Sequence, residues 1–242
     1  MKTQVVTRLA FITAGLLWTS FAEAQWGTIK GQILVDGELP KRRDLVANVG
    51  GIGNVPDETV VVDAKTKGLA NLVILPVNKP TTIHPELLKS KVTQVVFDQQ
   101  RLRFVPHVLL VRTDQQVQVV SGDPVVHNVH TLPMRNPGEN FNVQPNDRKG
   151  VTVNLKKAER LPVAVISDLY PWMRGWWMVV DHPYAAVTNE KGEFEINNLP
   201  VGDHVFVIWH EKAGYVDRAL QIKVKDGENV LPALDYPASL FQ

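Results

Sequence analysis

The sequence contains no cysteine, and this absence excludes several kinds of chemistry at once. None of the 242 residues carries a thiol, so no disulfide and no cysteine nucleophile can form. A blue-copper centre is also excluded in its usual form, because it needs a thiolate together with two imidazoles. We likewise expect no lipid anchor of the bacterial type, which is attached to a cysteine at the cleavage site.

An excess of charge of either sign is also missing. Lys and Arg number 26 and Asp and Glu 25, which gives a formal net charge of +1. Such a balance argues against nucleic acid or an anionic membrane surface as the main partner. The common enzyme motifs are missing too: we find no G-x-S-x-G elbow, H-E-x-x-H pair or P-loop. We therefore expect a protein that is not an enzyme, although an acid/base site assembled only in space stays open.

Long apolar runs are confined to the amino terminus. Residues 1–24 combine the basic residues Lys2 and Arg8 with a short apolar stretch and an A-x-A triplet at Ala22–Ala24. This pattern is typical of a secretory signal peptide. A core helix would explain neither the charges nor the triplet. We expect export to the periplasm or beyond, with a mature chain that starts near Gln25 and has no membrane span.

The rest of the chain predicts an all-β fold. In residues 26–36, the apolar residues Ile29, Ile33 and Val35 fall on one face of an alternating pattern. From residue 92 onward, β-branched runs recur about every ten residues between turn signals, which is typical of a sandwich or barrel. "NEKGE" predicts a hairpin turn in which Gly192 adopts a positive φ.

Imidazole and thioether groups are the candidate metal ligands. His127, His130 and Met134 lie close together in "DPVVHNVHTLPM", and Met173 ends "SDLYPWM". Positions three apart on a strand face opposite sides, so His127 and His130 reach one metal only if the strand ends between them. The alternative is one buried, hydrogen-bonded histidine and one solvated histidine.

The tryptophans form a second candidate site. Trp172, Trp176 and Trp177 are close in sequence, and the last two must face opposite sides of a strand. One then fills the core, while the other lies on a surface, a second domain or a ligand. A domain interface and an aromatic platform for a polysaccharide both fit this pattern.

Several strings together resemble a known family. "RFVPHVLLVR", "GDPVVHNVH", "LPVAVISDLYPWMRGWWMVVDHPY" and "WHEKAGY" are similar to exported bacterial cupredoxin-like proteins, common in planctomycetes, that carry a transthyretin-like (carboxypeptidase-regulatory-like) module. The resemblance implies a cupredoxin-like β-sandwich at residues 91–182. It would be inserted in or packed on a transthyretin-like β-sandwich formed by residues 26–90 and 183–237.

The resemblance also gives meaning to the stretch "SDLYPWM". In that family the loop typically reads C-D-x-H-P-W-M, and its Cys and His are copper ligands with Met as a possible third. Ser167 stands where the thiolate would be, and Tyr170 stands where the imidazole would be. Only Met173 and the upstream His127 match the family's ligands. The resemblance thus implies a vestigial copper loop.

Three functions follow as hypotheses. The first is a non-catalytic binding or structural module of the cell envelope, with an envelope protein or polysaccharide as partner and no cofactor. The second is weak copper binding or delivery through a remodelled site, in which His130, Met134 or Tyr170 joins His127 and Met173. The third is a carbohydrate-binding module that acts through the tryptophans.

Overall fold

The computed structural model describes residues 25–39, 41–48 and 51–242. The predicted signal peptide, residues 1–24, therefore lies outside the described residues. Within them the regular structure is strands, apart from the 3-10 turns η2 (Pro85–Leu87) and η3 (Ala238–Phe241). The all-β prediction is confirmed. None of the helical elements in the described ranges is long and apolar enough to cross a bilayer.

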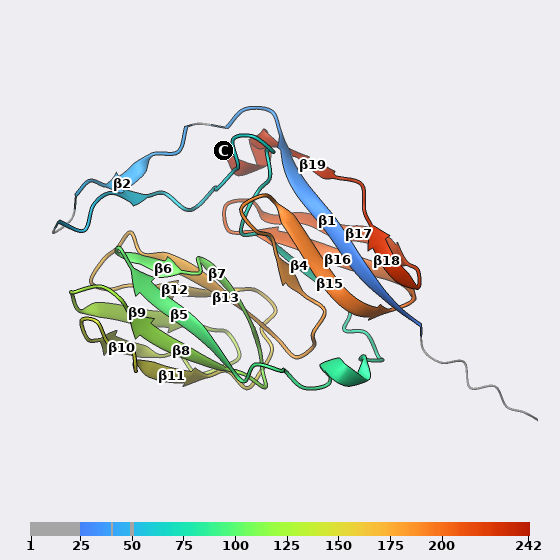
Figure 1. Cartoon of the computed structure of the whole chain (residues 1–242). Coiled ribbons are helices and arrows are strands. Elements are labelled where there is room, and N and C mark those ends of the chain that lie inside the picture. The colour runs from blue at the N-terminus through green and yellow to red at the C-terminus, as the bar shows by residue number, and fades with distance from the viewer. Residues whose placement is uncertain (1–24, 40, 49–50) are drawn as a thin grey trace, which may run out of the picture.

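One sandwich is built from strands at both ends of the chain (Figure 1). Its sheets run in the orders β15-β1-β18, with β19 also paired to β1, and β14-β4-β16-β17. The strands are β1 (Trp26–Asp36), β4 (Val73–Pro76), β14 (Ala186–Val187), β15 (Glu193–Pro200), β16 (Gly202–His210), β17 (Gly214–Val224), β18 (Gly227–Val230) and β19 (Leu234–Pro237). We call this the outer sandwich. Its core includes Ile29 and Ile33, which are fully buried as the alternation in β1 predicts.

The middle of the chain forms a second sandwich, which we call the middle sandwich. Its sheets run in the orders β10-β9-β12-β13-β7 and β11-β8-β5-β6. The strands are β5 (Gln94–Gln100), β6 (Arg103–Val105), β7 (Val108–Arg112), β8 (Gln116–Ser121), β9 (His127–Leu132), β10 (Asn140–Val143), β11 (Val151–Asn154), β12 (Val163–Ile166) and β13 (Arg174–Val180). Two of the pairs, β13 with β7 and β5 with β8, are parallel. Phe97, Phe104 and Trp177 fill the space between the sheets.

The strands of the middle sandwich lie between β4 and β14 in the chain. This is the strand order expected if the middle sandwich is inserted into the outer sandwich. The domain boundaries themselves, and the transthyretin-like character of the outer sandwich, stay predictions.

An apolar seam joins the two sandwiches. Met178 and Val180, from the face of β13 that points away from the middle core, pack with Val73 of β4 and Trp209 of β16. The rings of Trp176 and Trp209 meet edge to face with centroids 5.1 Å apart. Burial of these side chains stabilises the contact by about 25 cal/mol per Å² of apolar surface removed from water.

One segment of the amino-terminal part leaves the outer sandwich. We call residues 41–48 and 51–59 the arm; it contains the short paired strands β2 (Asp44–Val46) and β3 (Val55–Pro56). Figure 1 shows the arm, in blue, extending over the end of the middle sandwich near β6. Val55 is 2% exposed and belongs to the core cluster of the middle sandwich, and Ile52 packs against the same cluster. The arm therefore covers a sandwich to which the predicted boundaries do not assign it.

Candidate functional site

The loop from Ser167 to Met173 connects β12 to β13 at one end of the middle sandwich. Two hydrogen bonds fold it back on itself: Tyr170 N–H donates to Ser167 Oγ at 3.1 Å, and Met173 N–H donates to the Tyr170 carbonyl at 2.8 Å. A third ties it to the neighbouring strand, since Asp168 N–H donates to Asn128 Oδ1 at 2.9 Å. These bonds give the loop one fixed shape.

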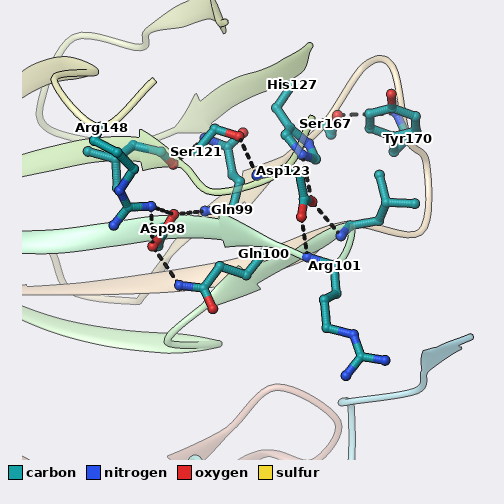
Figure 2. A network of polar contacts seen from close by, with 12 residues as sticks. Asp98, Gln99, Gln100, Arg101, Ser121, Asp123, His127, Arg148, Ser167 and Tyr170 are labelled. Atoms are coloured by element: carbon teal, nitrogen blue, oxygen red, sulfur yellow. Dashed lines mark hydrogen bonds and ion pairs between the residues drawn. The ribbon is translucent and has the colours of Figure 1, made fainter. Parts of the chain in front are cut away.

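The sequence places Ser167, Tyr170 and His127 in one site, and the structure brings them together (Figure 2). His127 opens β9 and is fully buried, and Ser167 is 4% exposed. The rings of His127 and Tyr170 meet edge to face with centroids 5.4 Å apart. Met173 is 2% exposed and lies in the core cluster of the same sandwich.

Asp123 is the buried partner of His127, and the sequence reading did not single it out. Its Oδ2 lies 2.9 Å from His127 Nε2. The same carboxylate accepts the backbone N–H groups of Arg101 and Leu102 at 2.6 and 2.8 Å. These two residues form the β5–β6 turn with positive φ values of 53° and 59°. The i, i+4 spacing of Asp123 and His127 is visible in the sequence, but only the turn shows why the carboxylate is there.

These contacts define the state of the His127 ring. Because a carboxylate only accepts, Nε2 carries the hydrogen that faces Asp123, and Nδ1 of the neutral ring is a lone pair. Nδ1 is buried and has no partner among the described residues. Burial lowers the pKa of His127 below its ordinary value, although the hydrogen bond to Asp123 acts in the opposite direction.

A second ion-pair cluster lies beside this site in Figure 2. Arg148 Nη1 contacts both oxygens of Asp98 at 2.9 and 2.8 Å, and Gln100 Nε2 donates to Asp98 at 2.6 Å. Asp98 is buried while the side chain of Arg148 is largely exposed. The cluster supplies hydrogen bonds to a buried carboxylate near the end of β5. It thereby fixes the strand that leads into the β5–β6 turn, to which Asp123 is hydrogen-bonded.

The hypothesis that His127 and His130 bind one metal ion together is wrong. β9 continues through both residues, so they face opposite sides of the sheet. His130 lies on the outer face, where its Nδ1 is 3.1 Å from Asp168 Oδ1. A hydrogen bond from Asn140, together with the contact to His130, holds the pKa of Asp168 below its usual value. Met134 is 76% exposed, on the loop that follows β9.

The tryptophans do not form a common surface, so the predicted platform is wrong as a set. Trp177 is fully buried in the middle sandwich. Trp176 faces the opposite side, as predicted, and packs in the seam, where its Nε1–H donates to Glu211 at 2.9 Å. Trp172 is half-buried against the core of the middle sandwich. Of the two alternatives for Trp176, the contact between the sandwiches is the one that the structure has.

The donor groups at this site do not fit a blue-copper centre. Ser167 offers a neutral, hard hydroxyl that already accepts the Tyr170 N–H, and no thiolate exists in the chain. Tyr170 offers no imidazole. Across the described ranges, no group of three or more His, Asp or Glu side chains is arranged to hold a metal ion. What remains at this site is the unpartnered Nδ1 of His127, with the buried thioether of Met173 in the core of the same sandwich.

Comparisons with known proteins add little beyond this geometry. No family model and no curated protein matches the chain. Among solved structures, a mutant of reduced amicyanin shows 15% identity and a TM-score of 0.31, covering 44% of this chain and 97% of its own. A purple cupredoxin from Nitrosopumilus maritimus shows 14% identity and a TM-score of 0.29, covering 36% and 98%.

A Cu-containing nitrite reductase from Thermus scotoductus shows 18% identity and a TM-score of 0.30. The match covers 43% of this chain and 25% of the reductase, so the chain spans a small part of that enzyme. With such low TM-scores these similarities carry no argument of their own. The description of the fold rests on the strand pairing, which makes the chain an all-β protein of two packed sandwiches.

Proposed function

We propose that this chain is an exported, non-catalytic binding or structural module of the cell envelope, built on a cupredoxin-like sandwich without an intact blue-copper centre. The observation that carries the proposal is that Ser167 Oγ, at the position of the family's thiolate, and Nε2 of His127 are both engaged in structural bonds. Ser167 Oγ accepts a backbone N–H within its own loop, and His127 Nε2 faces Asp123. The loop is thus a packed and self-bonded element of the sandwich.

Burial of the same groups supports the non-catalytic part of the proposal. A serine, a histidine and an aspartate lie near one another, which is the composition of a nucleophilic triad. His127 is fully enclosed and Ser167 is 4% exposed, so a substrate reaches neither without opening the loop. The hydroxyl of Ser167 is also engaged by Tyr170 N–H rather than by the ring of His127.

A copper titration tests the proposal. We expect Cu(II) to produce no intense visible absorption and no spin-resonance signal of a copper–thiolate centre, since the chain has no thiol. We expect the melting temperature to stay constant with Cu(II), because only an ion that binds the native state raises it. A coloured, thiolate-like complex or a stabilised protein would contradict the proposal.

The double variant Ser167→Cys/Tyr170→His tests whether the loop is a vacated site on an intact scaffold. It restores a thiolate and an imidazole beside the free Nδ1 of His127, and we expect a coloured Cu(II) complex. Ser239→Cys is the matched control, since Ser239 is exposed and far along the chain from the loop. If the double variant folds but stays colourless with Cu(II), the loop is not a vacated copper site.

Weak binding of Cu(I) is the second candidate function, and the unpartnered Nδ1 of His127 favours it. Imidazole and thioether both suit Cu(I), and Met173 is buried in the core of the same sandwich. A rise in melting temperature with Cu(I) that disappears in His127→Gln would support this candidate. No rise with Cu(I) in the unchanged protein would remove it.

A further inference from the structure

A small cavity lies between the arm and the middle sandwich. Its volume is about 30 Å³, which is enough to hold a water molecule. Three parts of the chain line it: the arm, the segment Leu102–His107 that contains β6, and the segment Trp172–Arg174. Its polar lining includes Glu58, His107 and the indole of Trp172.

Two of these lining groups are buried polar atoms without a partner among the described residues: Nδ1 of His107 and Nε1 of Trp172. The side chain of His107 is 8% exposed. An unpaired buried polar atom costs free energy, and native proteins usually satisfy such atoms with protein groups or ordered water. Two residues that line one cavity each carry such an unpaired atom, and this points to a guest in that cavity.

The neighbours of His107 determine what each ring nitrogen offers. Its Nε2 hydrogen-bonds to Oε1 of Glu211, and Oε2 of the same carboxylate accepts Nε1–H of Trp176 at 2.9 Å. Because a carboxylate only accepts, Nε2 of His107 carries a hydrogen. In the tautomer with its hydrogen on Nε2, Nδ1 is an acceptor. The indole Nε1–H of Trp172 is a donor only.

Glu58 supplies a third polar group at the cavity. Its Oε1 accepts Arg103 Nη1–H at 2.9 Å, and its Oε2 lies 4.0 Å from His107 Nδ1. That separation is too long for a direct hydrogen bond. In that tautomer both atoms are acceptors, and a molecule that donates to each of them can join them.

We propose that this cavity is a binding site for a single ordered water molecule. The water accepts the indole Nε1–H of Trp172 and donates its two hydrogens to His107 Nδ1 and Glu58 Oε2. Three partners of this kind are what a buried water in a protein typically has. A metal cation fits less well, because the indole N–H of Trp172 is a donor only and two cationic side chains, Arg103 and Arg174, line the same cavity.

The water completes a continuous polar connection through the molecule. It joins Glu58 on the arm to His107 in the middle sandwich, and His107 joins Glu211, at the end of β16 in the outer sandwich. Through Trp172, the water also contacts the end of the vestigial loop. One water thus links the arm, the loop and both sandwiches.

Nuclear magnetic resonance of the protein in solution tests the proposal. We expect a cross-peak between the indole Nε1–H of Trp172 and water, with the sign of a long-lived bound molecule. The resonance is assigned from its loss in Trp172→Phe. Trp177 is the matched control, because its indole Nε1 is also buried and unpartnered but does not line the cavity. Its N–H should show no contact with water.

The nitrogen chemical shifts of His107 provide a second measurement. We expect Nε2 in the protonated range and Nδ1 in the hydrogen-bonded acceptor range, and Glu58→Gln should leave the contact between water and Trp172 in place. The proposal is overturned if Trp172 N–H shows no more water contact than Trp177. It is also overturned if a crystal structure shows a dry cavity, a direct contact of Glu58 with His107 Nδ1, or an ion in the cavity.

Discussion

At the level of single residues, two buried polar side chains accept backbone hydrogen bonds at this site. The hydroxyl of Ser167 accepts the N–H of Tyr170, and the carboxylate of Asp123 accepts two backbone N–H groups besides facing His127. Each acceptor satisfies donors that are turned away from regular strand pairing. Substitution of either residue is therefore expected to affect stability.

The variant Ser167→Ala tests this role. It leaves the Tyr170 N–H without a partner in a site where Ser167 is 4% exposed. We expect the free energy of unfolding to fall by about 1–3 kcal/mol, the cost of a buried donor left unpaired. Urea unfolding measures the change. Ser239→Ala, at an exposed position, should change it by less than about 0.5 kcal/mol. Equal effects of the two variants would contradict the role.

The residue types of the site could be predicted from the sequence, but not their bonds. His127, Ser167 and Tyr170 come together as the resemblance implies. The partner of His127 could not be predicted, because Asp123 is oriented by a turn whose residues lie more than twenty positions earlier in the chain. The contacts of His107 could not be predicted either, because Glu58 and Glu211 come from distant segments of the chain.

At the level of elements, the turn between β14 and β15 illustrates a tight approach of two backbones. Gly192 has φ +75°, as predicted, and its N–H donates to the Asn189 carbonyl at 2.9 Å. A Cβ on Gly192 would lie 2.2 Å from the carbonyl oxygen of Ile33 in β1. The same carbonyl accepts the N–H of Leu69. The strands on either side of the turn belong to different sheets, so the predicted hairpin is wrong, and the turn packs against β1 instead.

Gly192→Ala should destabilise the protein by more than the cost of placing an alanine at a positive φ. The left-handed conformation costs about 1–2 kcal/mol for a residue with a side chain, and the collision with Ile33 adds to it. Gly214→Ala is the matched control: its φ is +68°, but no atom lies within 4 Å of the added Cβ. In thermal unfolding, the melting temperature of Gly192→Ala should be well below that of Gly214→Ala. Similar melting temperatures for the two variants would contradict the close approach.

Local sequence patterns predicted individual strands well, but they did not predict contacts between segments that are distant in the sequence. The buried face of β1 follows from alternation alone, since Ile29 and Ile33 are both fully buried. The placement of the arm does not follow, because "VANVGGIGNV" has turn residues but no periodicity. Two of its apolar residues, Ile52 and Val55, pack on a sandwich that begins some forty positions later.

At the level of the whole molecule, buried histidines near the contacts between the sandwiches make stability depend on pH. Burial lowers the pKa of both His182 and His210 to about 4, from an ordinary value of 6.5. Nearby acidic groups, Asp181 and Glu211, oppose this effect without cancelling it. The folded protein therefore binds fewer protons than the unfolded chain between pH 6.5 and 4.

Unfolding in urea at pH values between about 7 and 5 measures this dependence. Stability should be full above pH 6.5 and fall as the pH drops, by about 2 kcal/mol for each histidine at pH 5, because the unfolded chain gains protons first. Aspartates whose pKa is lowered, such as Asp57, begin to contribute only near and below 3.8. In His210→Gln the slope should decrease. A denaturation midpoint that is constant over this range would contradict the prediction.

The path of the chain through the two sandwiches determines the order in which they can be completed. β1 pairs with β15, β18 and β19, so its partners are some 160 to 200 positions away. Every strand of the middle sandwich, by contrast, lies between residues 94 and 180. During synthesis the middle sandwich is available first, whereas β1 waits as an unpaired edge until nearly the whole chain has emerged. Closure of loops this long makes folding slow, so the middle sandwich serves as the surface on which the outer one assembles last.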